Sequence, residues 1–187
     1  MSDERTFTED EQALLDLHRD WYYSNYNVNI PLMRTVFPSG KDTYIMYNLN
    51  GFPYFGVDEL DDLWVFYAKS SNFGLATDKV MRVEVDGGLG YVISEGIFPV
   101  DILRDDDGND LPEPQVMIRN FRSTEIYKRD DGAGNPEWKM WHFHCSDLSP
   151  LDEAPFSKTA ADSTDNRGLG NTPYSRAIEL DYSVYDK

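Results

Sequence analysis

Four long stretches of alternating apolar and polar residues occupy the second half of the chain and limit its fold more than any other feature. The stretches cover residues 77–85, 89–103, 115–127 and 138–146. Alternation with a period of two is typical of strands with one buried face, and residues that favour turns separate the four stretches. Long strands with short connections predict an antiparallel meander, bent enough to need β-bulges.

The N-terminal part of the chain carries the helical period instead. Thr8 and Glu11 form a capping-box pattern, which predicts a helix over residues 8–26. Asn29, followed by Ile and Pro, predicts a short second helix, and Gly56 opens a third after a strand over residues 43–49. This order predicts an α+β fold in which three N-terminal helices cover one face of a curved sheet.

Charge and cysteine content narrow the functional classes. The 187 residues include 34 acidic and 17 basic side chains, a net charge of −17. The negative electrostatic field of such a chain repels phosphate backbones and anionic lipids, so we expect no nucleic-acid or membrane partner. The single cysteine, Cys145, excludes an intramolecular disulfide, and the charged N-terminus lacks the apolar core of a signal peptide. We therefore expect a cytoplasmic protein.

Composition changes after Ser146. Residues 150–187 are rich in Asp, Ser, Thr, Pro and Gly and are too few for a core of their own, so we expect one domain over residues 1–149 and a C-terminal extension. Several apolar and aromatic side chains could tie the extension to the domain: Leu151, Phe156, Tyr174, Ile178, Leu180 and Tyr182. We expect it to drape over the domain or a neighbour, and a flexible tail is the alternative.

Two stretches resemble a known family. Residues 119–127 read Arg-Asn-Phe-Arg-Ser-Thr-Glu-Ile-Tyr, and residues 138–146 read Trp-Lys-Met-Trp-His-Phe-His-Cys-Ser. Together they resemble the last two strands of the SnoaL-like branch of the nuclear transport factor 2-like superfamily. The resemblance covers residues 8–149 and implies a cone-shaped, curved antiparallel sheet wrapped on three helices. Relatives include isomerases, dehydratases, cyclases and a non-catalytic kinase association domain, so the fold implies no single activity.

Alternation gives each of these two strands a face with polar groups. The residues on these faces are Asn120, Arg122, Thr124 and Ile126 on one strand, and Trp138, Met140, His142, His144 and Ser146 on the next. In the family these faces line the cone interior, where a guanidinium beside imidazoles needs a ligand or an anion. We therefore expect His144 to move protons and Arg122 to stabilise an oxyanion. The alternative is that they only make structural hydrogen bonds.

The His-x-His spacing of His142 and His144 can also suit a metal ion. A third ligand could come from Asp58, Asp78 or Glu95. The pattern singles out none of them, and the family usually works without metal. We therefore expect neither a metal nor an organic cofactor.

The chain departs from the family at one catalytic pair. Related dehydratases pair an aspartate near the end of the first helix with a histidine at the start of the third strand. Here no acidic residue lies between Asp20 and Asp42, and the strand begins Ala-Thr-Asp at Ala76. The usual pair is therefore doubtful, and Asp78 or Asp58 becomes the candidate base.

Aromatic hydroxyls are abundant in the elements that surround the expected cone. A tyrosine can donate a hydrogen bond to a substrate oxygen and stack on an aromatic substrate. We expect Tyr44 to take part in catalysis. The expected substrate-binding residues are Tyr22, Tyr26, Tyr47, Tyr54, Trp64, Asn120, Thr124, Met140 and His142. The alternative is that most of the tyrosines are core or interface residues.

These groups favour a cofactor-independent lyase acting on an aromatic small molecule. The aromatic lining and the missing dyad are similar to sphingomonad-type diarylpropane γ-formaldehyde lyases, which implies retro-aldol loss of formaldehyde from a lignin-derived diol. The alternatives are a dehydratase, cyclase or isomerase of a hydrophobic cyclic substrate, and a non-catalytic binding or assembly module. Trp141 and Phe143 are expected on the outer face, which favours a homodimer or homotrimer.

Overall fold

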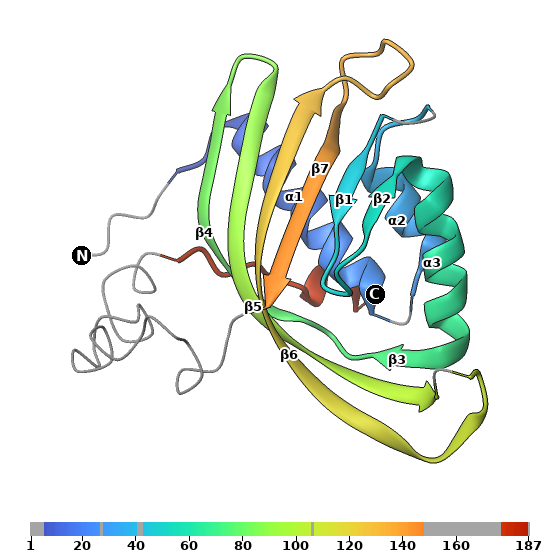
Figure 1. Cartoon of the computed structure of the whole chain (residues 1–187). Coiled ribbons are helices and arrows are strands. Elements are labelled where there is room, and N and C mark those ends of the chain that lie inside the picture. The colour runs from blue at the N-terminus through green and yellow to red at the C-terminus, as the bar shows by residue number, and fades with distance from the viewer. Residues whose placement is uncertain (1–5, 27, 41–42, 106, 148–176, 187) are drawn as a thin grey trace, which may run out of the picture.

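Figure 1 presents a computed structural model that describes residues 6–26, 28–40, 43–105, 107–147 and 177–186. The helices are α1 (Glu9–Asn25), α2 (Ile30–Val36) and α3 (Gly56–Ser70), and a 3₁₀ turn covers Ser183–Tyr185. The strands are β1 (Ile45–Tyr47), β2 (Pro53–Phe55), β3 (Ser71–Phe73), β4 (Thr77–Asp86), β5 (Leu89–Arg104), β6 (Asp110–Arg129) and β7 (Trp138–Asp147). Among these residues, no helix is both long enough and apolar enough to cross a bilayer.

Local side-chain chemistry sets the starts of the helices. Thr8 and Glu11 form the predicted capping box at the start of α1. At the start of α2, the side chain of Asn29 accepts a hydrogen bond from the backbone of Leu32. Gly56, with φ at 75°, begins α3 in a conformation that only glycine adopts without strain.

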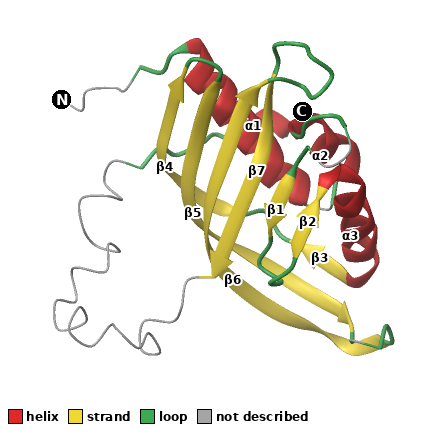
Figure 2. Cartoon of the chain, turned by 45° about the horizontal axis from the view of Figure 1, so that its top comes forward, coloured by secondary structure: helices red, strands yellow, loops and turns green. Residues whose placement is uncertain are grey.

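The sheet runs in the order β2-β1-β7-β6-β5-β3, and β4 pairs with β5 beside β3. All pairs are antiparallel except β1 and β7, which run parallel. Figures 1 and 2 show β5 and β6 bending together around the helices. The predicted α+β cone, a curved sheet wrapped on three N-terminal helices, is confirmed, with one parallel pair in an otherwise antiparallel sheet.

The concave face of the sheet packs against the helices. Leu14 and Trp21 of α1 and Trp64 of α3 are buried against Val92 and Phe121 of the sheet. This packing removes apolar surface from water and is the main stabilising term of the domain.

The inward-facing residues of β6 differ from the prediction. Phe121, Ser123, Glu125 and Tyr127 are buried, whereas the alternate residues lie on the outer face. The prediction that Asn120, Arg122 and Thr124 face the interior is therefore wrong.

On β7 a β-bulge changes the face halfway along the strand. Met140 pairs with Tyr127 and is buried, but His142 pairs with Ile126, so Trp141 has no partner on β6. One extra residue reverses the alternation beyond it. Phe143 and Cys145 consequently face inward. The predictions of an inward His142 and His144 and an outward Phe143 are wrong.

Residues 177–186 lie against β4 and α1. Ile178 exchanges two backbone hydrogen bonds with Val80, of 3.1 and 2.8 Å. Tyr185 stacks on Tyr23 with a distance of 3.8 Å between ring centroids. Leu180 and Tyr182 pack against the core, together with Ile178. The predicted boundary at residue 149, with Leu151, Phe156 and Tyr174, lies outside the described residues.

Candidate functional site

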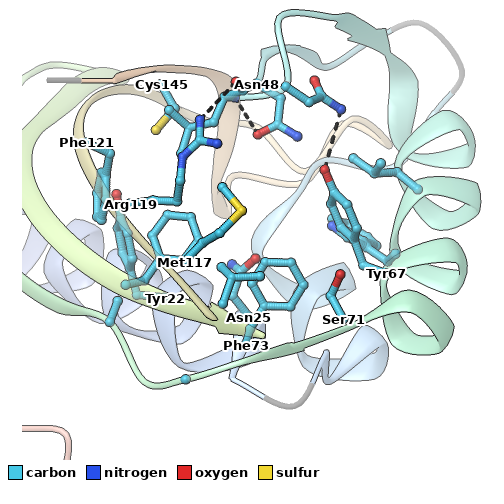
Figure 3. Close-up of a pocket in the computed structure, with 18 of the residues that line it drawn as sticks. Tyr22, Asn25, Asn48, Tyr67, Ser71, Phe73, Met117, Arg119, Phe121 and Cys145 are labelled. Carbon is cyan, nitrogen blue, oxygen red and sulfur yellow. Dashed lines mark hydrogen bonds between the residues drawn. The ribbon is translucent and has the colours of Figure 1, made fainter. Parts of the chain in front are cut away.

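A cavity of about 180 Å³ lies between α1, α3 and the concave face of the sheet (Figure 3). Most of its wall is aromatic or aliphatic: Trp21, Tyr22, Met46, Leu49, Leu63, Trp64, Phe73, Ala76, Phe98, Val100, Ile102, Met117, Phe121 and Phe143. An apolar cavity of roughly 150 Å³ in another protein holds benzene. This cavity therefore has room for one aromatic ring, and a larger ligand has to extend beyond it.

Polar side chains interrupt the apolar wall near α3. Asn50 donates hydrogen bonds to the hydroxyl oxygens of Tyr54 at 2.6 Å and Tyr67 at 3.5 Å. Burial raises the pKa of Tyr67, so its phenol stays protonated at neutral pH. Burial also raises the pKa of the Cys145 thiol, which makes this cavity residue a poor nucleophile.

Arg119 of β6 brings a guanidinium group to the wall. Its Nε and Nη2 donate to the two carboxylate oxygens of Asp147 at 3.1 and 2.6 Å, and Nη2 also lies 3.5 Å from the carbonyl oxygen of Leu49. Nη1 has no hydrogen bond to any residue that the structure describes. Figure 3 shows Arg119 on one side of the cavity and Tyr67 with Ser71 on the other. The cavity thus has two polar sides with aromatic rings between them.

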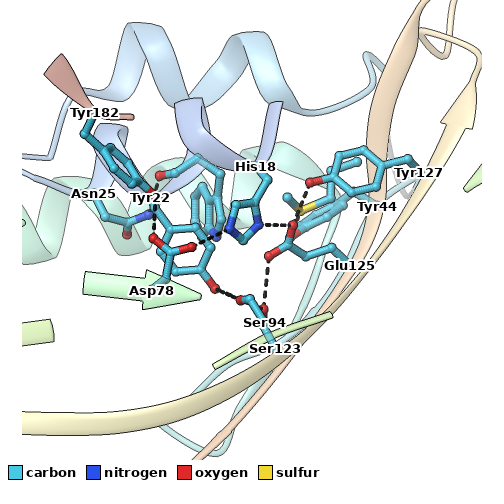
Figure 4. A network of polar contacts seen from close by, with 12 residues as sticks. His18, Tyr22, Asn25, Tyr44, Asp78, Ser94, Ser123, Glu125, Tyr127 and Tyr182 are labelled. Carbon is cyan, nitrogen blue, oxygen red and sulfur yellow. Dashed lines mark hydrogen bonds and ion pairs between the residues drawn. The ribbon is translucent and has the colours of Figure 1, made fainter. Parts of the chain in front are cut away.

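A sealed polar cluster lies behind the cavity wall (Figure 4). His18 of α1 contacts Asp78 through Nε2 and Glu125 through Nδ1, both at 2.8 Å, and Tyr182 donates to Asp78 at 2.5 Å. Burial alone would lower the pKa of His18. The charges and hydrogen bonds of Glu125 and Asp78 outweigh burial and raise this pKa to about 10. His18 is therefore an imidazolium held between two carboxylates at neutral pH.

A chain of hydroxyl groups connects this cluster with the cavity. Tyr22, which lines the cavity, donates to Ser123 at 3.0 Å, and Ser123 donates to Glu125 at 3.0 Å. The hydroxyl of Ser94 lies beside this chain, 2.8 Å from that of Ser123. Tyr127 donates a further hydrogen bond to Glu125 at 2.6 Å. The cavity wall is thus linked by hydrogen bonds to a buried carboxylate.

A histidine–aspartate pair between the first helix and β4 therefore does exist, with its partners exchanged. The family pattern places the aspartate on the helix and the histidine on the strand, whereas here His18 comes from α1 and Asp78 from β4. The pattern of the related dehydratases is absent from the sequence because the two residue types have exchanged elements. Asp78 forms hydrogen bonds with His18 and Tyr182 behind the cavity wall.

The structure brings only some of the predicted site residues to the cavity. Tyr22 and Trp64 line it, and the Tyr54 hydroxyl meets Asn50 of its wall. Tyr44 and Met140 are buried together, with the Tyr44 hydroxyl 4.0 Å from the Met140 sulfur, and neither lines the cavity.

The remaining predicted residues lie away from the cavity. Tyr26 is 39% exposed, and Asn120 and Thr124 lie on the outer face. Arg122 pairs with Glu95 on that same face. Tyr47 lies there with its ring edge-on to His142 and His144, 5.7 Å from each ring centroid. Arg122 and His144, the predicted catalytic pair, therefore do not meet at the cavity.

Sequence reasoning missed His18, Arg119 and Glu125. His18 follows Leu14 by four residues, so helical spacing already placed it on the buried face of α1. Arg119 and Glu125 share the face of β6 that also carries Phe121, and that alternate face was the available signal. The contact between His18 and Glu125 spans 107 positions and has no counterpart in local sequence.

No family model matches the sequence, and no curated protein is detectably similar to it. Solved structures are similar in fold. A ketosteroid isomerase-like protein from Erwinia carotovora atroseptica has a TM-score of 0.60 at 13% identity, covering 77% of this chain and 100% of that chain. A candidate dehydratase of the nuclear transport factor 2-like family from Streptomyces avermitilis has a TM-score of 0.58 at 14% identity, covering 75% and 97%. A nuclear transport factor 2-like superfamily protein from Salmonella enterica has a TM-score of 0.52 at 16% identity, covering 77% and 96%. The chain therefore has the nuclear transport factor 2-like fold.

Proposed function

We propose that the protein is a lyase that binds a small aromatic molecule in the central cavity and breaks a C–C or C–O bond in it. The observation that supports this best is that Arg119 and Tyr22 share one cavity, with Tyr22 linked through Ser123 to the carboxylate of Glu125. Elimination and retro-aldol reactions need a proton acceptor and a group that stabilises a growing negative charge. They need no external electron acceptor, so the proposal includes no redox cofactor.

Each group has a defined role in this proposal. Arg119 donates from Nη1 to the substrate oxygen that gains negative charge. Tyr22 accepts a substrate proton as it passes its own to Ser123 and onward to Glu125. Burial and the charge of Glu125 raise the pKa of Tyr22, so the phenol is protonated between turnovers and the transfer runs along the whole chain.

The finer form of the proposal is loss of formaldehyde from a 1,2-diarylpropane-1,3-diol. The primary hydroxyl gives up its proton, the adjacent C–C bond breaks, and formaldehyde leaves. The electron pair of that bond forms the new double bond as the benzylic hydroxyl departs with a proton as water, which leaves a stilbene. One ring fits the cavity of about 180 Å³, and the second has to lie beyond it.

The test is incubation of the purified protein with such a diol, with stilbene followed by fluorescence and formaldehyde by chemical trapping. We expect equal amounts of both products. Arg119→Gln and Tyr22→Phe should each lower the rate about 100-fold, the effect typical of losing a charge-stabilising or proton-transfer group. Arg122→Gln, on the outer face, is the matched control and should keep the rate. Ring binding without either product would show that the reaction assignment is wrong.

A non-catalytic binding module is the second candidate. It is favoured by the lining of the cavity, since none of the described residues that form it is Asp, Glu or His. Trp21 and Trp64 lie in the wall, so ligand entry should change tryptophan fluorescence whether or not turnover follows. Binding that is insensitive to Ser123→Ala, with no product from any diol, ether or cyclic ketone, would favour this candidate. A dehydratase or isomerase would use the same groups, and product analysis separates these from the proposed reaction.

A further inference from the structure

The ion pair between Arg119 and Asp147 limits which polar group the cavity accepts. Asp147 takes the Nε and Nη2 side of the guanidinium through both carboxylate oxygens. The Arg119 side chain is 28% exposed and that of Asp147 is 50% exposed, so Asp147 approaches Arg119 from the solvent side. The charge of Arg119 is thus already balanced before a ligand enters, while Nη1 can still donate.

The surroundings add negative charge. Behind the cavity wall the imidazolium of His18 faces two carboxylates, Asp78 and Glu125, which leaves one negative charge in excess. The whole chain carries a net charge of −17. An anionic ligand at Arg119 would be placed beside the carboxylate of Asp147 and would lose its hydration in the process. A neutral oxygen can accept from Nη1 without either cost.

The other polar side of the cavity is uncharged as well. Tyr67 is held by Asn50, and Ser71 lies beside Tyr67 in Figure 3. Together with Asn25 and Asn48, these groups offer hydrogen bonds and no charge. Both polar sides therefore suit carbonyl, methoxyl or hydroxyl oxygens on opposite ends of one aromatic ring.

We infer that the cavity selects a neutral, oxygenated aromatic ring, and that Asp147 is the specificity-determining residue that excludes aromatic carboxylates. The inference rests on the proposed function only in requiring that the cavity bind an aromatic molecule. It defines the substrate class, because phenol ethers, aryl alcohols and aryl ketones fit it and benzoates do not.

The test compares 4-methoxybenzamide with 4-methoxybenzoate, which have nearly the same shape and differ in charge. Both are titrated into the protein at neutral pH and followed by calorimetry and tryptophan fluorescence. The amide should bind at least about tenfold more tightly to the wild type. Asp147→Asn keeps the shape of the side chain and removes its charge, so benzoate affinity should rise at least about tenfold while amide affinity stays within about threefold.

Two further variants complete the test. Asp110→Asn removes a charge from the exposed pair of Arg104 and Asp110 elsewhere on the sheet, and should change neither affinity. The single variant Arg119→Gln, in which Asp147 is unchanged, should bind the amide more weakly than the wild type does. Equal affinity of the wild type for both compounds, or a benzoate affinity that Asp147→Asn leaves unchanged, overturns the inference and leaves aromatic binding intact. Failure of the wild type to bind either compound contradicts the proposed function and the inference with it.

Discussion

His18 links the stability of the protein to pH. Its pKa is about 10 in the folded protein and about 6.5 when unpaired, so its favourable contribution is complete below pH 6.5 and is lost as the pH rises toward 10. Burial works to raise the pKa of Asp78, but His18 lowers it overall, so that contribution is lost only as the pH falls below the usual 3.8. In urea denaturation we expect the free energy of unfolding to be highest between about pH 3.8 and pH 6.5 and to fall by a few kcal/mol at pH 10.

Replacement of His18 tests the origin of this pH dependence. His18→Gln leaves two carboxylates buried without a cation, which should cost about 3–5 kcal/mol and flatten the decline between pH 6.5 and 10. His144→Gln is the matched control, because His144 lies exposed on the outer face. Parallel pH profiles for wild type and His18→Gln would contradict this origin.

Residue type alone could not identify the site. Arg119 and Arg122 are both arginines of β6, and only their alternation phase separates a cavity residue from a surface residue. Glu125 would count as an outward residue on β6 by its charge, yet it is fully buried because His18 and Tyr127 meet it there. Such contacts depend on tertiary structure, so the polarity of Glu125 assigns it to the wrong face of β6.

At the scale of elements, periodicity predicted the helices and the long strands, and it failed where β7 gains a residue. The alternation of β7 reads the same on paper with or without a bulge at Trp141, since the bulge is defined by pairing with β6. The short strand β3 was missed, because three residues are too few to show a period.

Gly96 lies at a point where β5 approaches its neighbours closely. A Cβ there would lie 2.7 Å from the Phe121 ring and 2.9 Å from the carbonyl oxygen of Thr77. Gly96→Ala should therefore destabilise the protein by about 1–3 kcal/mol in urea denaturation. Gly88→Ala, where the nearest atom is 4.0 Å away, should change stability by less than about 0.5 kcal/mol. Similar losses for both variants would contradict this packing.

The C-terminal segment contributes a hydrogen bond to the buried cluster. Tyr182→Phe removes the hydroxyl that donates to Asp78 and should cost about 1–3 kcal/mol, because a charged acceptor loses a donor in a buried site. Tyr47→Phe, on the exposed outer face, is the control for the loss of a phenol oxygen. Thermal denaturation compares the two variants, and an unchanged midpoint for Tyr182→Phe would show that this hydroxyl is dispensable.

At the scale of the whole molecule, the outer face of the sheet exposes Ile97, Val116 and Ile118 to 47, 69 and 68%. Exposed apolar groups on one sheet face favour association, so we expect a homodimer or homotrimer in sedimentation velocity. Ile118→Lys should shift the protein toward monomer, whereas Leu89→Lys, at the turn end of β5, should not. Added salt should strengthen association by screening the net charge of −17. A wild type that is monomeric at every concentration would contradict this expectation.

The cavity itself follows from the overall arrangement that the sequence predicted. The three helices cover only part of the concave face of a sheet that bends around them, and the side chains that face inward line the space that remains. The side chains that line the cavity could not be predicted in the same way. They depend on which face of each strand points inward and on the contacts of α1 with β4 and β6.

The unpaired residue at Trp141 has an evolutionary consequence. If the end of β7 shifted by one position against β6, the bulge would disappear. Phe143 and Cys145 would then face outward, and the imidazoles of His142 and His144 would face the cavity. A lineage could then acquire or discard basic groups in its binding chamber through a change in strand length alone, with every chemically active residue conserved.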